Sequence, residues 1–237
     1  MSIKLSLEYH DELNQKLWDG EELRPEVQEK LMVIANKWKE FARIPDDAVH
    51  DIVITGGNVN RNYTALSDID IHFLIDTYRL PISDPEMLQD YMKAKKDVWA
   101  KNHDIKIKGY PIELYAQDVN KETPVSQGIY SILNKQWVIK SENLHLNFEN
   151  DFGLKSKIKE LMRQIDNVID HNESIDTAKE VKRKITDMRG ASIQKSGEFA
   201  IENLIFKDLR NRGYLQKITD YIKNNEDRAL SLESRLY

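Results

Sequence analysis

The sequence predicts an α+β fold, in which a small mixed β-sheet flanked by helices is followed by an all-α C-terminal part. In the first 150 residues, short apolar segments that could form strands alternate with amphipathic helical segments. Beyond Asp151, apolar residues recur only at helical spacing. The change falls in a polar stretch over residues 147–153. We therefore expect a catalytic or binding domain over residues 1–150 and a helical domain over residues 151–237.

The N-terminal part contains two predicted helices, two strands and a hairpin. Proline suits the first turn of a helix, and the apolar residues after Pro25 recur every three or four positions. In chain order we expect a helix from Pro25 to Phe41, a strand over 51–55 ending at Gly56-Gly57, a strand over 69–75, a helix from about Asp84-Pro85, and a hairpin-like stretch over 104–116 turning near Gly109.

The C-terminal part contains four apolar stripes at helical spacing. We expect helices over residues 154–168, 175–188, 199–209 and 215–230. Glycine is common directly after a helix end, so Gly190 and Gly213 are predicted to stop the second and third of these helices.

Composition excludes several classes of protein. The 237 residues include no cysteine, which rules out disulfides, thiolate nucleophiles and Cys-ligated metal centres. No apolar run approaches the roughly 20 residues that span a bilayer, so we expect a cytoplasmic protein without a membrane partner. The net charge is −5, with −7 in the first 150 residues and +2 in the rest. This balance argues against a general nucleic-acid coat protein and suits carboxylates that hold metal ions.

The most informative motif is the Asp-x-Asp sequence at Asp68 and Asp70. In a strand over residues 69–75, alternate side chains face opposite sides, so the isoleucines would face the core and the two aspartates the other side. Two neighbouring carboxylates repel each other and resist desolvation unless a cation lies between them. Mg²⁺ prefers oxygen ligands and keeps several waters for substrate phosphates. The pair therefore predicts a divalent-metal site.

A glycine turn precedes this motif. Gly56 and Gly57 follow the first strand, and glycine lets a backbone bend closely around a phosphate and present its N–H groups. If the two strands are neighbours, the turn lies near the aspartates. Asn58 and Ser67, which flank the loop, are further candidates for nucleotide contact because both side chains can donate hydrogen bonds.

A third carboxylate is expected beside the aspartate pair. Our candidate is Glu113, because Ile112 and Leu114 would face the core and leave Glu113 on the opposite side of a strand. The alternatives, which the sequence leaves open, are Asp76, Asp104 and Asp118. Two metal ions held by three carboxylates can activate a hydroxyl and stabilise a departing pyrophosphate.

Together these residues resemble the nucleotidyltransferase superfamily, the group that shares its core with DNA polymerase beta. The match covers roughly residues 24–118 and consists of the first helix, Gly56-Gly57, Asp68, Asp70 and Glu113. The family often has serine at or after the glycine pair, where this chain has Asn58. The whole chain is also similar to uncharacterised nucleotidyltransferases predicted in bacteriophage genomes, which would place it in the cytoplasm of a bacterial host.

The resemblance implies a transferase that moves a nucleoside monophosphate from an NTP, ATP by default, to an acceptor hydroxyl. It implies two Mg²⁺ ions, or Mn²⁺, held by Asp68, Asp70 and Glu113, with the phosphates on Gly56, Gly57 and Asn58. Lys207 and Arg210 share a helix face and could reach the triphosphate, although an ordinary charged face is the simpler interpretation. An RNA end, a nucleotide, a small molecule and a protein remain open as acceptor, and the oligomeric state stays undetermined.

Two other classes of function compete with this prediction. A sugar-nucleotide glycosyltransferase also uses Asp-x-Asp after an apolar strand, but usually places a βαβ nucleotide-binding region ahead of it. A non-catalytic nucleotide-sensing module could share the same fold. No Gly-rich loop ending in Lys-Ser or Lys-Thr is present, which argues against a P-loop NTPase.

Overall fold

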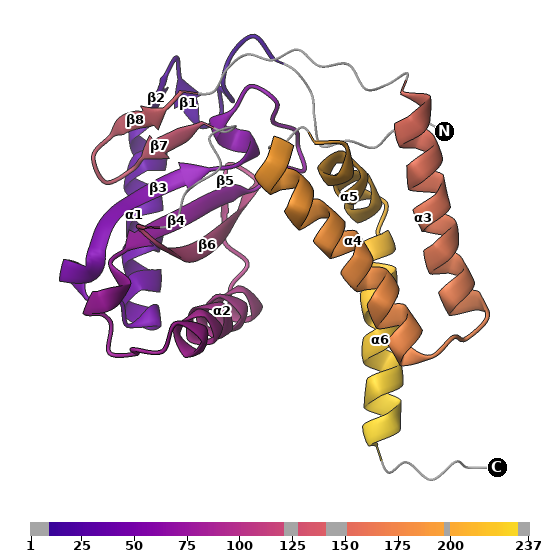
Figure 1. Ribbon diagram of the computed structural model, residues 1–237. Helices are drawn as coiled ribbons and strands as arrows, with labels where there is room; N and C mark the ends of the chain where they lie inside the picture. Colours follow the sequence, from indigo (N-terminus) through magenta and orange to yellow (C-terminus); the bar gives the residue numbers. More distant parts are fainter. Residues whose placement is uncertain (1–9, 121–127, 141–150, 197–199, 232–237) are drawn as a thin grey trace. The chain divides into compact units, whose positions relative to one another are not determined.

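The computed structural model describes residues 10–120, 128–140, 151–196 and 200–231 (Figure 1). They belong to two compact units, Ser6–His145 and a unit within Leu146–Tyr237, which are described separately here. Within the described ranges the fold is mixed α+β, with six α-helices, a six-stranded mixed sheet and a two-stranded sheet. The predicted fold class is confirmed at this level. Most of the predicted join over residues 147–153, and Phe199 at the start of the third predicted C-terminal helix, lie outside the described residues.

The six-stranded sheet has the order β5-β6-β4-β3-β7-β8. Its central strands β4 and β6 are parallel, and every other neighbouring pair is antiparallel. The strands are β3 (Val49–Thr55), β4 (Ile69–Ile75), β5 (Lys106–Ile107), β6 (Tyr110–Asp118), β7 (Ile129–Ser131) and β8 (Gln136–Ile139). A separate hairpin consists of β1 (Trp18–Asp19) and β2 (Glu22–Leu23).

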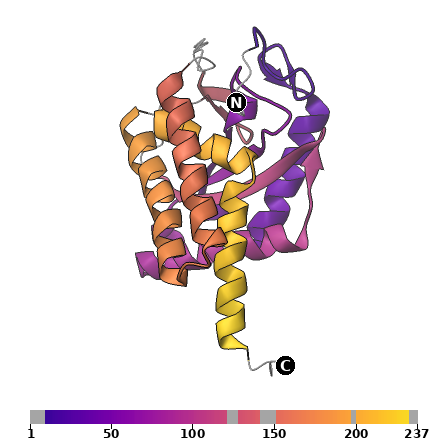
Figure 2. The ribbon, with the colours of Figure 1, turned by 90° about the vertical axis from the view of Figure 1, so that its right-hand side faces the viewer.

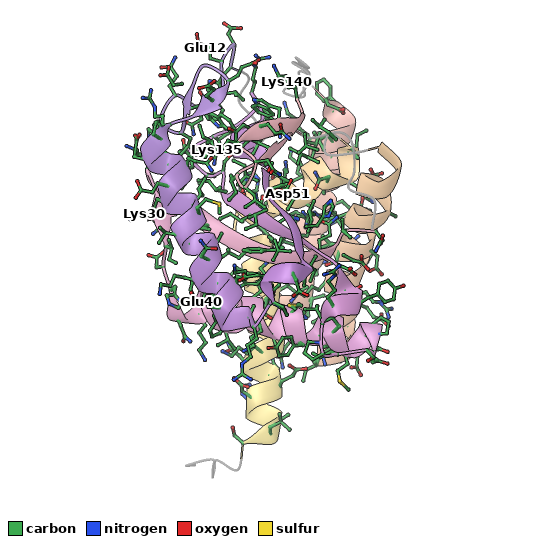
Figure 3. The ribbon with its side chains drawn as sticks, turned by 90° about the vertical axis from the view of Figure 1, so that its left-hand side faces the viewer. Glu12, Lys30, Glu40, Asp51, Lys135 and Lys140 are labelled. Carbon is green, nitrogen blue, oxygen red and sulfur yellow. The ribbon has the colours of Figure 1, made fainter. Side chains whose placement is uncertain are left out.

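Helices α1 (Pro25–Ala42) and α2 (Pro85–Asn102) pack on the core side of this sheet. The ring of Trp38 on α1 lies 5.0 Å from that of Phe73 on β4, measured between centroids. Figure 1 shows α1 behind the strands, and Figure 3 shows its outer side, from which the exposed Lys30 and Glu40 point away from the sheet. Burying aromatic surface against one face leaves the other face of β4 free for polar residues.

Strand β4 follows the predicted alternation throughout its length. Ile69, Ile71, Phe73 and Ile75 are buried, and the residues between them, beginning with Asp70, are only half-buried. A period of two in burial is what a strand with one apolar face requires. The bounds of this strand were predicted correctly from the sequence.

Local chemistry sets where the helices begin. Pro25 and Pro85 occupy the first turns of α1 and α2. Backbone N–H groups there have no partner within the helix, so the N–H that proline lacks is not missed. The Asp84 side chain accepts a hydrogen bond of 2.7 Å from the amide of Met87, which caps α2. Both helices were predicted. The strands β1, β2, β7 and β8 were not, because each spans only two to four residues and has no clear alternation.

The second unit contains four helices that pack against one another. They are α3 (Phe152–Asp170), α4 (Ile175–Ser196), α5 (Ile201–Asn211) and α6 (Tyr214–Leu230). Figure 2 shows the three longer ones, α3, α4 and α6, running side by side. Gly213 adopts φ +80° and separates α5 from α6, as predicted. The predicted stop at Gly190 is wrong, because α4 continues six residues further and Gly190 does not have a positive φ. No helix among the described residues is both long and apolar enough to cross a membrane.

Candidate active site on the open face of the sheet

The glycine turn at the end of β3 packs directly against the Asp-x-Asp motif. Gly56 adopts φ +83°, and a Cβ atom on it would lie 2.3 Å from Oδ2 of Asp70. A Cβ atom on Gly57 would lie 2.8 Å from Oγ of Ser67. Real Cβ atoms do not approach oxygen this closely, so both glycines are required by the close approach of the backbone to these side chains. The prediction that the glycine turn lies near the Asp-x-Asp motif is confirmed.

The strand pairing brings the third carboxylate beside the second. In the parallel pairing of β4 with β6, Asp70 is aligned with Glu113, and in the antiparallel pairing of β3 with β4, Thr55 is aligned with Asp70. Neighbouring strands lie about 4.8 Å apart, so aligned residues project from the same side. Asp70, Glu113 and the turn after Thr55 therefore meet where β3 ends and β4 begins.

The other carboxylates considered from the sequence lie elsewhere. Asp118 is aligned with Ile75, at the opposite end of β4 from Asp70, and accepts a hydrogen bond of 3.1 Å from the Thr77 hydroxyl. Asp76 caps a short 3-10 turn at that same end. Asp104 is exposed and pairs with Lys106 at 2.9 Å. Of these four candidate acids, Glu113 alone is aligned with Asp70.

The pKa of Tyr115 is affected by all three candidate carboxylates. Burial, its hydrogen bond to Glu113, and the charges of Glu113, Asp70 and Asp68 together raise the pKa of the Tyr115 phenol. Asp68, which precedes the first residue of β4, therefore lies close enough for its charge to act on the same ring. The three acids form one electrostatic cluster on this face of the sheet.

Glu113 has two partners on a single oxygen. Its Oε2 accepts a hydrogen bond from the Tyr115 hydroxyl and forms an ion pair of 3.1 Å with Nζ of Lys96 on α2. The same ammonium lies 3.6 Å from the centroid of the Tyr115 ring. Beyond Tyr115, the side chains of His72 and Gln117 are joined at 3.1 Å, so polar contacts continue along the same face of β4 and β6.

Asn58 is buried and forms hydrogen bonds within the protein. The residue is 1% exposed, and its side-chain Nδ2 donates a hydrogen bond of 2.8 Å to the backbone carbonyl of Asp68. Its Oδ1 accepts a hydrogen bond of 2.7 Å from Asn14, and its carbonyl accepts one from the Trp18 indole. Asn58 thus connects the glycine turn to the backbone of the Asp-x-Asp motif.

Ser67 is also buried, at 7% exposure, and its hydroxyl accepts a hydrogen bond of 3.0 Å from the amide of Thr64. Ser67 therefore closes the loop that leads into β4. For both Asn58 and Ser67 the geometry favours positioning of the motif over direct contact with a ligand.

Lys207 and Arg210 lie on α5, in the second unit. Arg210 is exposed and Lys207 half-buried, while Asn203 on the same helix is buried and accepts a hydrogen bond of 3.1 Å from Arg189. Because the two units are described separately, the expectation that Lys207 and Arg210 contact a nucleotide stays a prediction.

The residues present suit a divalent cation in their chemistry. Asp68, Asp70 and Glu113 supply only oxygen ligands, and the absence of a side chain at Gly56 lets the backbone of the turn approach the Asp70 carboxylate closely. Among the residues described, however, no three His, Cys, Asp or Glu side chains already converge as a preformed metal site. The orientation of Glu113 toward Lys96 and Tyr115 gives a reason, since one of its oxygens is already engaged.

A cavity of about 460 Å³ lies near the β1–β2 hairpin. Its lining mixes the acidic residues of this region with Trp18, Arg24 and Arg61, and does not include the three candidate carboxylates. The candidate site is thus a surface on the sheet, distinct from this cavity.

Comparisons with known protein families, with curated proteins and with solved structures gave no match. Sequence reasoning missed Lys96 and Tyr115. Tyr115 had a usable signal, because it follows Glu113 by two residues and so shares its face of a strand. Lys96 had none, since its contact with Glu113 depends on how α2 packs beside β6.

Proposed function

We propose that this protein is a Mg²⁺-dependent nucleotidyltransferase, which moves a nucleoside monophosphate from an NTP to an acceptor hydroxyl and releases pyrophosphate. The observation that carries the proposal is the alignment of Asp70 with Glu113 across β4 and β6, with Gly56 packed against Asp70. It combines a group of carboxylates with a turn free of side chains, which are the two parts that triphosphate chemistry needs.

Each residue has a role in this proposal. Asp68 and Asp70 hold both metal ions, and Glu113 holds the one nearer the acceptor. Bound divalent ions would supply charge neutralisation for the phosphates and lower the pKa of the acceptor hydroxyl. The backbone of Gly56 and Gly57 faces the phosphates, where a side chain would collide with Asp70 or Ser67.

The reaction is then a displacement at the α-phosphorus. The acceptor hydroxyl gives up its proton to water, its oxygen forms a bond to that phosphorus, the bond from the phosphorus to the oxygen that bridges to the β-phosphate breaks, and pyrophosphate leaves. Asn58 acts indirectly, because its hydrogen bond to the Asp68 carbonyl fixes the backbone that presents the carboxylate. The proposal keeps the expectation that Lys207 and Arg210 contact the nucleotide and that ATP is the default donor.

The topology supports this proposal over a glycosyltransferase. Between residue 10 and Asp68, the described elements are the β1–β2 hairpin, whose strands have two residues each, α1, β3 and short 3-10 turns. Strand β3 pairs antiparallel with β4. The parallel unit is formed by β4, α2 and β6, so it follows the Asp-x-Asp motif. A βαβ nucleotide-binding region ahead of the motif is therefore not present among the described residues.

The proposal is tested by incubating the full chain with each α-³²P-labelled NTP and Mg²⁺, and offering RNA, protein extract or no acceptor. We expect labelled product with the wild type and none with the Asp68→Ala/Asp70→Ala double variant. A UDP-sugar in a parallel reaction should give no transfer. NTP binding without any label would instead support a nucleotide-sensing module, and transfer from the UDP-sugar would support a glycosyltransferase.

A further inference from the structure

The feature that the proposed function does not use is the ammonium group of Lys96. It comes from α2, which packs on the core side of the sheet, yet its Nζ lies 3.1 Å from Oε2 of Glu113. The Lys96 side chain is 27% exposed and that of Glu113 is 42% exposed. An ion pair in this intermediate environment is screened less than a fully exposed one.

The position of this ammonium is held by more than the carboxylate. Nζ lies 3.6 Å from the centroid of the Tyr115 ring, within the range of a cation–π contact, and the Tyr115 hydroxyl donates to the same Glu113 oxygen. Lys96, Tyr115 and Glu113 thus form a closed triangle of contacts.

The triangle lies inside the acidic cluster. Glu113, the carboxylate that the ammonium contacts, is aligned with Asp70 across β4 and β6. Three carboxylates on one face of a sheet repel one another unless a cation is present. The ammonium of Lys96 supplies a cation in direct contact with Glu113.

We propose that Lys96 is the resident counter-cation of this site: it neutralises the acidic cluster through Glu113 and sets the affinity of the site for divalent metal ions by competing with them for that carboxylate. This inference deepens the proposed function and rests on it for the metal site. Removing the ammonium should strengthen metal binding, because a unit positive charge near a divalent ion opposes its binding.

The test measures Mn²⁺ binding to the full chain, with the free ion followed by electron paramagnetic resonance. We expect Lys96→Met to lower the dissociation constant about tenfold, the size expected for a unit charge acting on a divalent ion across a few ångströms of largely aqueous medium. Methionine keeps the helix propensity of α2 and most of the side-chain length.

The chain offers a matched control in the adjacent residue. Lys95→Met removes the same charge from the same helix, but Nζ of Lys95 lies over the rings of Phe41 and Tyr91, at 4.7 and 5.3 Å from their centroids. Lys95→Met should leave the Mn²⁺ dissociation constant within about twofold of the wild type, since its charge is not paired with Glu113. Lys96→Arg, which keeps the charge, should behave like the wild type.

A double-mutant cycle identifies the carboxylate involved. In a Glu113→Gln background, Lys96→Met should strengthen Mn²⁺ binding less than it does in the wild type, because the competition for the Glu113 carboxylate is gone and only the repulsion between the ammonium and the ion remains. Melting temperatures give a second readout: Lys96→Met should melt lower than the wild type in EDTA and show the larger rise on addition of Mn²⁺.

The inference is overturned if Lys96→Met binds Mn²⁺ no more tightly than Lys95→Met, or if the gain is undiminished in Glu113→Gln. It is also overturned if neither the wild type nor Lys96→Met binds the ion, and in that case the proposed metal site falls with it. Tighter binding in Lys96→Met together with no nucleotidyl transfer by the wild type would support Lys96 as the counter-cation and refute the proposed function alone.

Discussion

Replacing Gly56 by alanine tests the close approach of the glycine turn to Asp70. Gly56 adopts φ +83° and ψ −167°, a region that is almost exclusive to glycine. A residue with a side chain held there costs about 1–3 kcal/mol. The new Cβ atom would also lie 2.3 Å from Oδ2 of Asp70, so the carboxylate must move away.

Gly109→Ala is the matched control, because Gly109 also has a positive φ, +94°, but a Cβ atom there would meet nothing within 4 Å. We expect both variants to lose about 1–3 kcal/mol in the free energy of unfolding, measured by urea denaturation and far-UV circular dichroism. Only Gly56→Ala should also lose affinity for Mn²⁺, by tenfold or more, since a carboxylate ligand is displaced. Unchanged Mn²⁺ affinity in a folded Gly56→Ala protein would refute this reasoning.

Three further substitutions test the fold that supports the site. Asn58→Ala should reduce the free energy of unfolding by about 2 kcal/mol in urea, because the Asp68 carbonyl and the Asn14 amide lose their partner, and a wild-type midpoint would contradict this. Trp38→Ala removes a fully buried ring and should cost about 3–5 kcal/mol in the same assay, whereas a surface change such as Lys30→Ala should stay within about 0.5 kcal/mol. Asp84→Ala should cost about 1 kcal/mol through the lost cap of α2, seen as an earlier urea midpoint.

The parts of the fold that follow from local pattern were predictable. Strand β4 alternates over seven residues, and α1 and α2 begin with proline after a polar or charged residue, so their sequences contain the necessary information. Strand β7 depends on pairing with β3, and β8 on pairing with β7, and the local sequence does not specify either pairing. Gly190 shows the opposite case: a glycine can remain inside a helix when its neighbours continue the pattern.

The candidate site was predictable to the same degree. Asp70 and the glycine turn follow from short-range sequence, because one connection joins two neighbouring strands. The alignment of Glu113 with Asp70 requires the parallel pairing of strands separated by α2, and the sequence alone left three other acids open. The sequence suggested that Asn58 donates a hydrogen bond to a phosphate. In the structure the residue is buried, and its side-chain amide donates a hydrogen bond to the Asp68 carbonyl instead.

The central claim is that Asp68, Asp70 and Glu113 act together as the metal site of a nucleotidyltransferase. The most direct measurement compares pyrophosphate release from NTP and Mg²⁺ by Glu113→Gln and Asp118→Asn, which remove one carboxylate each from the same strand, the first beside Asp70 and the second at the strand's C-terminal end. We expect a loss of about a hundredfold or more for Glu113→Gln, from the several kcal/mol of transition-state stabilisation that a metal site supplies, and activity near the wild type for Asp118→Asn. Equal rates for the two variants, or a greater loss in Asp118→Asn, would contradict the claim.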